Sequence, residues 1–430
     1  MKRQHSIVLA VVLALGGCQS RRPVPPDPAG QPAEALAAEV IVKWSDIAYQ
    51  ALVAKDKYAS PLWASRLLAM MHIAQHDAVG AIVPRYLPYA FDGNEPGADP
   101  IAAAAGAAHG VLVAALPEQR AMLDQSLQAS LAEAGADSDR REQGLRVGEK
   151  AAAAILARRR DDGSDTPMAG GYQPRTGPGA YRFVAPFDLV VAPGWRHVRP
   201  FALQGPEQFR VPPPPPLDSA AYAQAFTEVK MSGGKTSSLR TADQSAYAKF
   251  WWEFSEIGWN RIARVVTTER KLGLVDAGRL FALLNMALAD SYVAGWDSKF
   301  QYDFWRPTTA IREAETDGNP ATAPDATWES AEITPPAQDY PSTHSALGRA
   351  GAEVLAAILG DHTPFAVTST TAPDAGARRF AGFREAAEEN ADSRVRAGLH
   401  FRFSCDAGQE LGQKVAAWTL AHQLGPRSRH

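Results

Sequence analysis

The sequence predicts an all-α protein, a bundle of many helices, and two observations carry that prediction. Apolar residues recur at intervals of three and four along most of the chain, which is the spacing of helices that face a core. The sequence has no alternating apolar and polar runs of useful strand length and no internal repeat of fixed period. With 430 residues, 46% of them hydrophobic, the chain can bury a large core.

The first 34 residues predict export and membrane anchoring. Lys2 and Arg3 precede an apolar run, 7–15, that is too short to span a bilayer and that leads into Gly-Gly-Cys18. This ending resembles the lipobox of bacterial lipoproteins, in which the cysteine is lipidated. We therefore expect a lipoprotein signal peptide at 1–18, lipidation of Cys18, and an outer-membrane anchor facing the periplasm. An ordinary signal peptide or a short anchor is the alternative.

A Pro-rich, polar stretch at 19–34 suits an extended tether, and helical patterning begins near residue 35. The helices expected in the first half of the folded body are 61–83, 101–116, and one or two within 123–157. Between about 160 and 217, repeated Gly and Pro residues interrupt the pattern. We expect this long segment to run irregularly over the surface, either as a functional lid or as a plain connector.

Helical patterning then returns and continues to the end of the chain. The expected helices are 220–229, 242–257, 276–296, one after residue 345, and one or more from 380 to the C-terminus. We divide the folded body into an N-terminal helical half, 35–217, and a C-terminal helical half, 218–430.

Charge and cysteine content limit the possible partners. The formal net charge is -3, so no global basic field would recruit nucleic acid, and any anion site must be local. Cys405 is the only cysteine besides Cys18, so acylation of Cys18 would leave no intrachain disulfide. We expect Cys405 to be a buried free thiol.

Three short segments in the last third carry residues that can bind a tetrahedral oxyanion. Lys299 and Arg306, seven positions apart and followed by Pro307, can neutralise and orient such an anion. Pro341-Ser342-Thr343-His344 precedes an apolar run and predicts a helix N-terminus, where free amides attract anions. Taken singly, each segment has a plainer interpretation, as a solvated charged face or as a helix cap.

The third segment contains Arg394 and His400. Six residues correspond to 240° around a helix, so one straight helix would aim these side chains differently. If both serve one site, the helix must distort or end near Gly398. Arg396 and Arg402 are alternatives for the charged role.

The order K-x6-R-P, P-S-x-H, S-R-x5-H is similar to the signature shared by vanadium-dependent haloperoxidases, bacterial class A acid phosphatases and type 2 phosphatidic acid phosphatases. Phe304-Trp305-Arg306-Pro307 and His400-Phe401-Arg402-Phe403 more closely resemble the haloperoxidase branch. The segment 64–78 also resembles bacterial members of that branch. The resemblance implies a single helical-bundle architecture for the mature chain.

It further implies a vanadate cofactor. His400 would bond vanadium through an imidazole nitrogen, and Lys299, Arg306 and Arg394 would neutralise the vanadate oxygens. Phosphate can occupy the same kind of site. The expected substrates are hydrogen peroxide and a halide.

In the second segment, the resemblance assigns a hydroxyl hydrogen bond to Ser342, a backbone amide to Thr343, and acid-base chemistry on peroxide to His344. Two positions depart from the family pattern. Thr343 stands where Gly is common, and Ser404 stands where an Asp often orients the metal-binding histidine; Asp406 is nearby but displaced. The second departure puts the support of the His400 imidazole in doubt.

Two other functions compete with this interpretation. In a periplasmic acid phosphatase, His400 would attack the phosphorus of a phosphomonoester, and His344 would protonate the leaving alcohol. A lipid phosphatase is disfavoured because that branch spans the membrane several times, whereas no segment of this sequence has the length and apolar character of a membrane span. A non-catalytic surface lipoprotein with the same fold is the third hypothesis.

A separate pair, His72 and His76, lies four residues apart beside Asp77 and could share a helix face to bind a metal. The sequence indicates no third ligand. We therefore favour structural histidines in the core.

Overall fold

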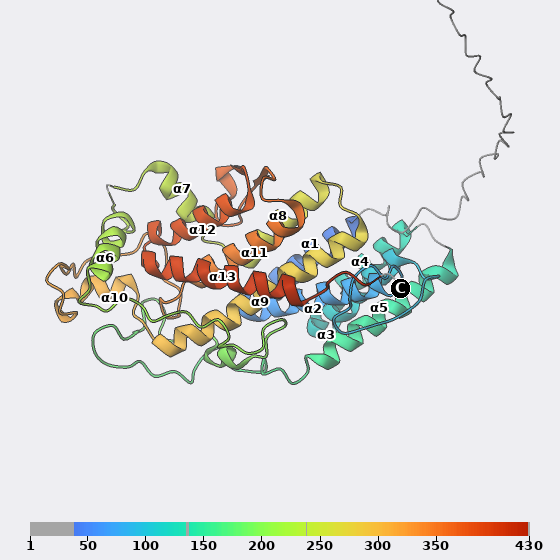
Figure 1. Cartoon of the computed structure of the whole chain (residues 1–430), viewed down its shortest axis with the longest axis horizontal. Coiled ribbons are helices and arrows are strands. Elements are labelled where there is room, and N and C mark those ends of the chain that lie inside the picture. The colour runs from blue at the N-terminus through green and yellow to red at the C-terminus, as the bar shows by residue number, and fades with distance from the viewer. Residues whose placement is uncertain (1–37, 135–136, 238, 429–430) are drawn as a thin grey trace, which may run out of the picture.

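The computed structural model describes residues 38–134, 137–237 and 239–428 (Figure 1). These ranges hold thirteen α-helices and one small antiparallel sheet, which confirms the all-α prediction. The predictions for Cys18 and the tether lie outside the described residues. The helices are α1 (Glu39–Asp56), α2 (Pro61–Gly80), α3 (Pro100–Ala115), α4 (Arg120–Glu133), α5 (Ser138–Arg158), α6 (Ala220–Ser232), α7 (Ala242–Phe250), α8 (Ser255–Glu269), α9 (Leu274–Tyr302), α10 (Pro307–Arg312), α11 (Thr343–Leu359), α12 (Phe383–Arg396) and α13 (Arg402–His422); the strands are β1 (Phe365–Val367) and β2 (Arg378–Phe380).

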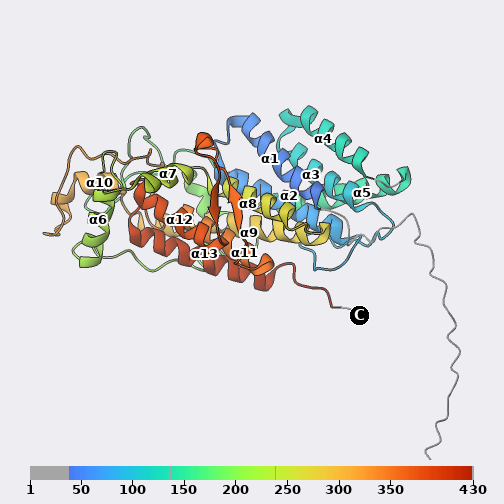
Figure 2. The same ribbon diagram turned by 90° about the horizontal axis from the view of Figure 1, so that it is seen from above.

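Helices α1 to α5 form one end of the elongated molecule (Figures 1 and 2). The Ala-rich α3 lies against α5 at very short range. A Cβ atom added at Gly148 of α5 would come within 2.5 Å of the Ala103 carbonyl oxygen of α3. Small side chains on both helices therefore allow a close backbone approach that larger residues would prevent.

Helix α9 connects the two ends of the molecule (Figure 1). It is 29 residues long and is buried on nearly all sides, packed between α2 of the first half and α11 and α13 of the second. A helix that is apolar all round is typical of a protein interior. Its last turn carries Lys299, so this central helix positions one of the predicted site residues.

The segment between α5 and α6 is irregular, as predicted, and it is fastened to the helices. The carboxylate of Asp290 on α9 accepts hydrogen bonds from the backbone amides of Phe201, Ala202 and Leu203, at 2.6 to 3.0 Å. Burial raises the pKa of Asp290 to about 6, and these three amides act in the opposite direction. The segment therefore forms a fixed wall along α9.

The prediction of one helix over 242–257 was wrong. The chain leaves the helix between Phe250 and Ser255, and α8 then continues to Glu269. In the break, the Glu253 carboxylate accepts hydrogen bonds from Arg261 of α8 and from the amide of Thr370. Those long-range partners stabilise the break, and apolar periodicity carries no information about them.

Within the described residues, no helix combines the length and the apolar character that a membrane crossing requires.

Candidate active site

The three predicted segments meet at one end of α9. Lys299 lies in the last turn of α9, and Arg306 precedes α10. Ser342 caps α11, and Arg394 lies in the last turn of α12. Each of these four side chains, like that of His400 before α13, belongs to a residue no more than 3% exposed.

The turn after α12 brings Arg394 and His400 to the same site. The helix ends at Arg396, and Gly398 has a φ of 78°, the left-handed conformation that favours glycine. The amides of Leu399 and His400 both donate to the Arg394 carbonyl, at 3.0 and 3.3 Å. The prediction that the helix ends near Gly398 is confirmed.

The two alternative arginines are used elsewhere. Arg396 and Arg402 both pair with Asp392 and Glu228, in a partly exposed cluster. Arg394, in contrast, has no carboxylate partner among the described residues and is 1% exposed. The structure therefore selects Arg394 for the buried charged role.

The hydrogen bonds of His400 indicate its tautomer. Arg306 can only donate, so its Nη1, 3.0 Å from His400 Nε2, places the imidazole lone pair on Nε2. The proton then belongs on Nδ1, which lies 2.9 Å from Asp339 Oδ1. The geometry departs from that of a regular hydrogen bond, but the two atoms are close enough for the carboxylate to orient the ring. Nε2 is thus the nitrogen available to bind a metal centre.

The sequence interpretation missed Asp339. It sought an orienting carboxylate after His400 and found Ser404 there instead. In the structure, the Ser404 hydroxyl donates to Asp339 Oδ2, and Asp339 Oδ1 faces His400. Ser404 therefore acts on the histidine through a carboxylate that lies three residues before Ser342. The adjacency of Asp339 to the P-S-x-H segment was the only available sequence signal.

The three cations contact backbone carbonyls, which hold them in place without neutralising them. Lys299 Nζ donates to Gln338 O at 2.5 Å and Asp339 O at 3.1 Å, and Arg306 Nε donates to Ala337 O at 2.7 Å. Arg394 donates to Trp251 O, but its buried Nε has no partner within the described part of the chain.

Electrostatics reflect this excess of positive charge. Burial lowers the pKa of Lys299, Arg306 and Arg394, the last to about 10, and the Arg306 charge further lowers that of Lys299 and Arg394. Burial also raises the pKa of Asp339 to about 7 and keeps His400 neutral by lowering its pKa. Three buried cations with one nearby carboxyl group form a site that a bound anion would stabilise.

The start of α11 supplies further donors. Ser342 Oγ accepts a hydrogen bond from Ser345 Oγ at 3.0 Å, so its own hydroxyl hydrogen remains available to an oxyanion. Thr343 is the first helical residue and has no positive φ, so glycine is not required there. A Cβ atom added at Gly295 of α9 would come within 2.5 Å of the Thr343 methyl group, so a larger residue at position 295 would clash with it. Gly295 thus accommodates the Thr343 departure.

His344 is suited to accept a proton. Its Nε2 lies 3.0 Å from the Glu253 carbonyl oxygen, which can only accept, so Nδ1 carries the lone pair. Burial, followed by the positive charge of Arg394, lowers its pKa well below the ordinary value. The neutral, basic form is therefore maintained at neutral pH.

His72 and His76 lie outside this site, and both form hydrogen bonds within the core. His72 Nδ1 contacts Gln75 Oε1 at 2.8 Å, and His76 Nε2 contacts the Leu87 carbonyl at 3.1 Å. Asp77 accepts from three backbone amides. No group of three metal-ligating side chains occurs within the described ranges. Cys405 is a buried free thiol, as expected, and burial raises its pKa to about 12.

This arrangement fits a tetrahedral or trigonal-bipyramidal oxyanion. It offers the unprotonated imidazole nitrogen of His400, three cations, a serine hydroxyl and, within the described residues, an unpaired guanidinium N–H, with the unprotonated Nδ1 of His344 beside them. The donor set suits phosphate and vanadate equally. Its chemistry alone does not distinguish phosphoryl transfer from halide oxidation.

Comparisons with known proteins show which oxyanion-binding proteins the chain resembles. Residues 279–425 match the family model described as the VCPO second helical-bundle domain. The vanadium chloroperoxidase of Curvularia inaequalis is 25% identical over 469 aligned positions, covering 82% of this chain and 76% of the relative.

Solved structures show the same fold. A bacterial vanadium-dependent iodoperoxidase has a TM-score of 0.79 at 21% identity, covering 92% of this chain and 99% of its own. A holo-type bacterial vanadium-dependent chloroperoxidase has a TM-score of 0.66 at 18% identity, covering 91% and 93%. Together with the ordered three-part motif and its convergence on one site, these matches show that the chain has the helical fold of the vanadium haloperoxidases and is similar to them in sequence.

Proposed function

We propose that this protein is a vanadate-dependent haloperoxidase that uses hydrogen peroxide to oxidise a halide. The observation that carries the proposal is His400 Nε2, which holds the imidazole lone pair and lies 3.0 Å from Arg306 in a shell of buried cations. A cofactor of one to two negative charges would match this surplus of positive charge. Vanadate bound there would supply a Lewis acid that polarises peroxide for attack by the halide.

The chain's own residues would then do three things. Lys299, Arg306 and Arg394 hold the oxyanion and balance its charge, and Ser342 donates a hydroxyl hydrogen bond to it. His344 Nδ1 accepts a proton from the incoming peroxide. The overall reaction converts a halide, peroxide and a proton to hypohalous acid and water.

One relative is a chloroperoxidase and another is an iodoperoxidase, so the two are named after different halides. We therefore assign peroxide as the oxidant and a halide as the electron donor. The choice among chloride, bromide and iodide is left to measurement.

The test compares two reactions of the full-length protein, purified in phosphate-free buffer. We expect bromination of a phenol dye that requires added vanadate and peroxide and that phosphate suppresses by competition. Hydrolysis of p-nitrophenyl phosphate is the parallel assay. Phosphate release that vanadate inhibits, without bromination, would contradict the proposal and favour an acid phosphatase.

We also propose that Cys18 carries the lipid that tethers the enzyme to the periplasmic face of the outer membrane, on the basis of the short apolar run that ends at this cysteine. Labelling of cells with a palmitate analogue is expected to mark the wild-type chain but not Cys18→Ser. Equal labelling of both chains would contradict it.

A further inference from the structure

A cavity of about 450 Å³ opens directly onto the candidate site, with His344 and Arg394 among its lining residues. That volume lies within the range of small-molecule pockets. Its remaining walls come from α1 and the chain just after it, from the break between α7 and α8 and the first turn of α8, from Phe187, from the loop before α11, and from Thr370 and Thr371. Both halves of the protein therefore contribute to it.

Its walls are apolar and aromatic. The described part of the chain has six exposed large hydrophobic side chains, and three of them line this cavity: Val53, Phe254 and Ile333. Phe187 and Trp252 add two further aromatic rings. Exposed apolar side chains that gather at one opening indicate a binding surface.

The backbone adopts an unusual conformation to build one wall. Lys57 and Tyr58 are consecutive non-glycine residues with φ of 57° and 64°, a left-handed conformation that costs roughly 1 kcal/mol or more at each position. Through this turn, the Tyr58 ring stacks on Phe254, with 6.0 Å between ring centroids and 28° between planes. Strain of this kind is concentrated at functional sites.

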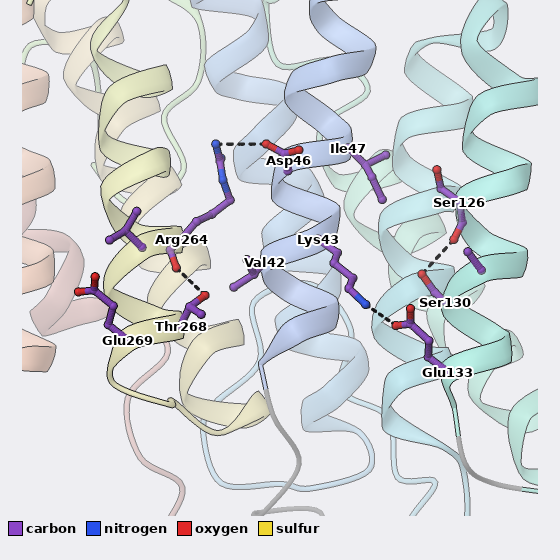
Figure 3. A pocket seen from close by; sticks show the side chains of 12 residues that line it. Val42, Lys43, Asp46, Ile47, Ser126, Ser130, Glu133, Arg264, Thr268 and Glu269 are labelled. Atoms are coloured by element: carbon purple, nitrogen blue, oxygen red, sulfur yellow. Dashed lines mark hydrogen bonds and ion pairs between the residues drawn. The ribbon is translucent and has the colours of Figure 1, made fainter. Parts of the chain in front are cut away.

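A hollow of about 680 Å³ between α1, α4 and α8 provides a contrast (Figure 3). Four of its five charged side chains pair with each other, Lys43 with Glu133 and Arg264 with Asp46. None of the oxyanion-site residues lines it. It therefore offers neither aromatic walls nor access to the site.

We propose that the 450 Å³ cavity binds an electron-rich aromatic acceptor of the phenol class beside the oxyanion site. This inference rests on the proposed function, since halogenation needs the hypohalous acid formed there. The aromatic walls suit a planar ring, and the cations Arg394 and Lys57 among the lining residues suit its hydroxyl or phenolate oxygen.

The transfer step balances. A π electron pair of the ring forms the carbon–halogen bond while the halogen–oxygen bond of hypohalous acid breaks and leaves its pair on oxygen. That oxygen, with the proton displaced from the ring, departs as water. The halogen of hypohalous acid accepts two electrons from the ring. Peroxide removed the same number of electrons from the halide in the preceding step.

The first experiment measures binding without cofactor or peroxide. Calorimetric titration of the full-length protein with 1-naphthol is expected to show saturable binding. Ile333→Asp and Phe254→Ala are each expected to weaken it about fivefold or more, because they remove apolar contact area. Leu87→Asp, at a comparably exposed leucine that does not line the cavity, is the matched control and is expected to change the Kd less than twofold.

The second experiment analyses products. Wild-type enzyme with bromide is expected to give a ratio of bromonaphthol isomers that differs from that of free hypobromous acid, and Ile333→Asp is expected to shift the ratio toward the free reagent. A wild-type ratio equal to that of the free reagent, or naphthol binding that the cavity variants do not weaken, would overturn the inference. Loss of the proposed function itself would appear differently, as failure to oxidise iodide, which needs no organic acceptor.

Discussion

Two buried clusters of charged side chains in this protein differ in whether each charge has a partner of opposite sign. In the paired cluster, Arg66 and Arg159 flank Asp162 at 2.7 and 2.8 Å, and Arg159 also donates to the carbonyls of Arg199 and Pro200. Burial acts to raise the pKa of Asp162, yet the bond from Arg66 and the charge of Arg159 hold it below its usual value. Each charged group of this cluster therefore lies beside a group of opposite charge.

The oxyanion cluster, formed by Lys299, Arg306, Arg394, Asp339 and His400, is different, because three cations share one carboxyl group and Arg394 forms no salt bridge among the described residues. Burial lowers the pKa of cations in both clusters, but the carboxyl group of Asp339 has a raised pKa whereas that of Asp162 has a lowered one. Removal of one partner from a buried cluster of paired charges destabilises the fold, whereas a cluster that leaves charge unmatched is prepared for a ligand. The comparison thus distinguishes buried charges that hold the structure together from buried charges that can bind a ligand.

The largest expected effect is that of His400→Ala. Loss of the only unprotonated nitrogen in the oxyanion cluster is expected to lower vanadate affinity and bromination at least a hundredfold. Calorimetric vanadate titration and circular dichroism would measure affinity and fold. The control is His422→Ala, at an exposed histidine of α13, which is expected to have no effect. Wild-type turnover in His400→Ala would remove this residue from the mechanism.

Replacement of one arginine by methionine in each cluster tests the comparison directly. Arg159→Met is expected to lower the free energy of unfolding by about 3 kcal/mol, because it removes a buried partner of Asp162. Arg394→Met in vanadate-free protein is expected to cost less than about 1 kcal/mol, or to stabilise, because it removes an unmatched buried charge. Urea unfolding would measure both. Equal destabilisation would mean that the two clusters do not differ in design.

Substitution of one carboxylate in each cluster should affect different quantities. Asp339→Asn is expected to weaken vanadate binding about 10- to 100-fold, since the His400 ring loses its orienting carboxylate. Asp162→Asn is expected to lower stability and to leave vanadate affinity unchanged. Titration of both variants checks this, and undiminished affinity in Asp339→Asn would show that other contacts orient the imidazole.

Glu256 extends the comparison to a buried acid without a cation. Burial raises its pKa to about 8, and Tyr292 Oη donates to it at 2.9 Å. The folded protein keeps a proton that the unfolded chain releases above pH 4.5, so this group's contribution to stability is lost as pH rises from 4.5 to 8. Glu256→Gln is therefore expected to gain about 1–3 kcal/mol relative to wild type between pH 5 and pH 8.5. Parallel pH dependence in the two proteins would contradict this protonation state.

The sequence was most informative where the signal was local. Apolar spacing predicted most helices, and the 240° offset of Arg394 and His400 predicted the end of α12 near Gly398. It could not predict the break between α7 and α8, which Glu253 stabilises through a residue more than a hundred positions away. The same limit concealed Asp339, whose role depends on Ser404, 65 positions along the chain. Such contacts arise only once the helices have packed.

Helix α9 has a consequence for how the protein would lose the proposed activity on heating. Because it packs against α2 at one end of the molecule and carries Lys299 near its own C-terminus, the two helical halves share one structural element. Melting of α2 would expose a long apolar face of α9, the helix that carries Lys299. Heat inactivation and loss of helical signal should therefore coincide in one cooperative transition, and a fragment that begins at residue 279, where the family match begins, should aggregate rather than retain vanadate binding.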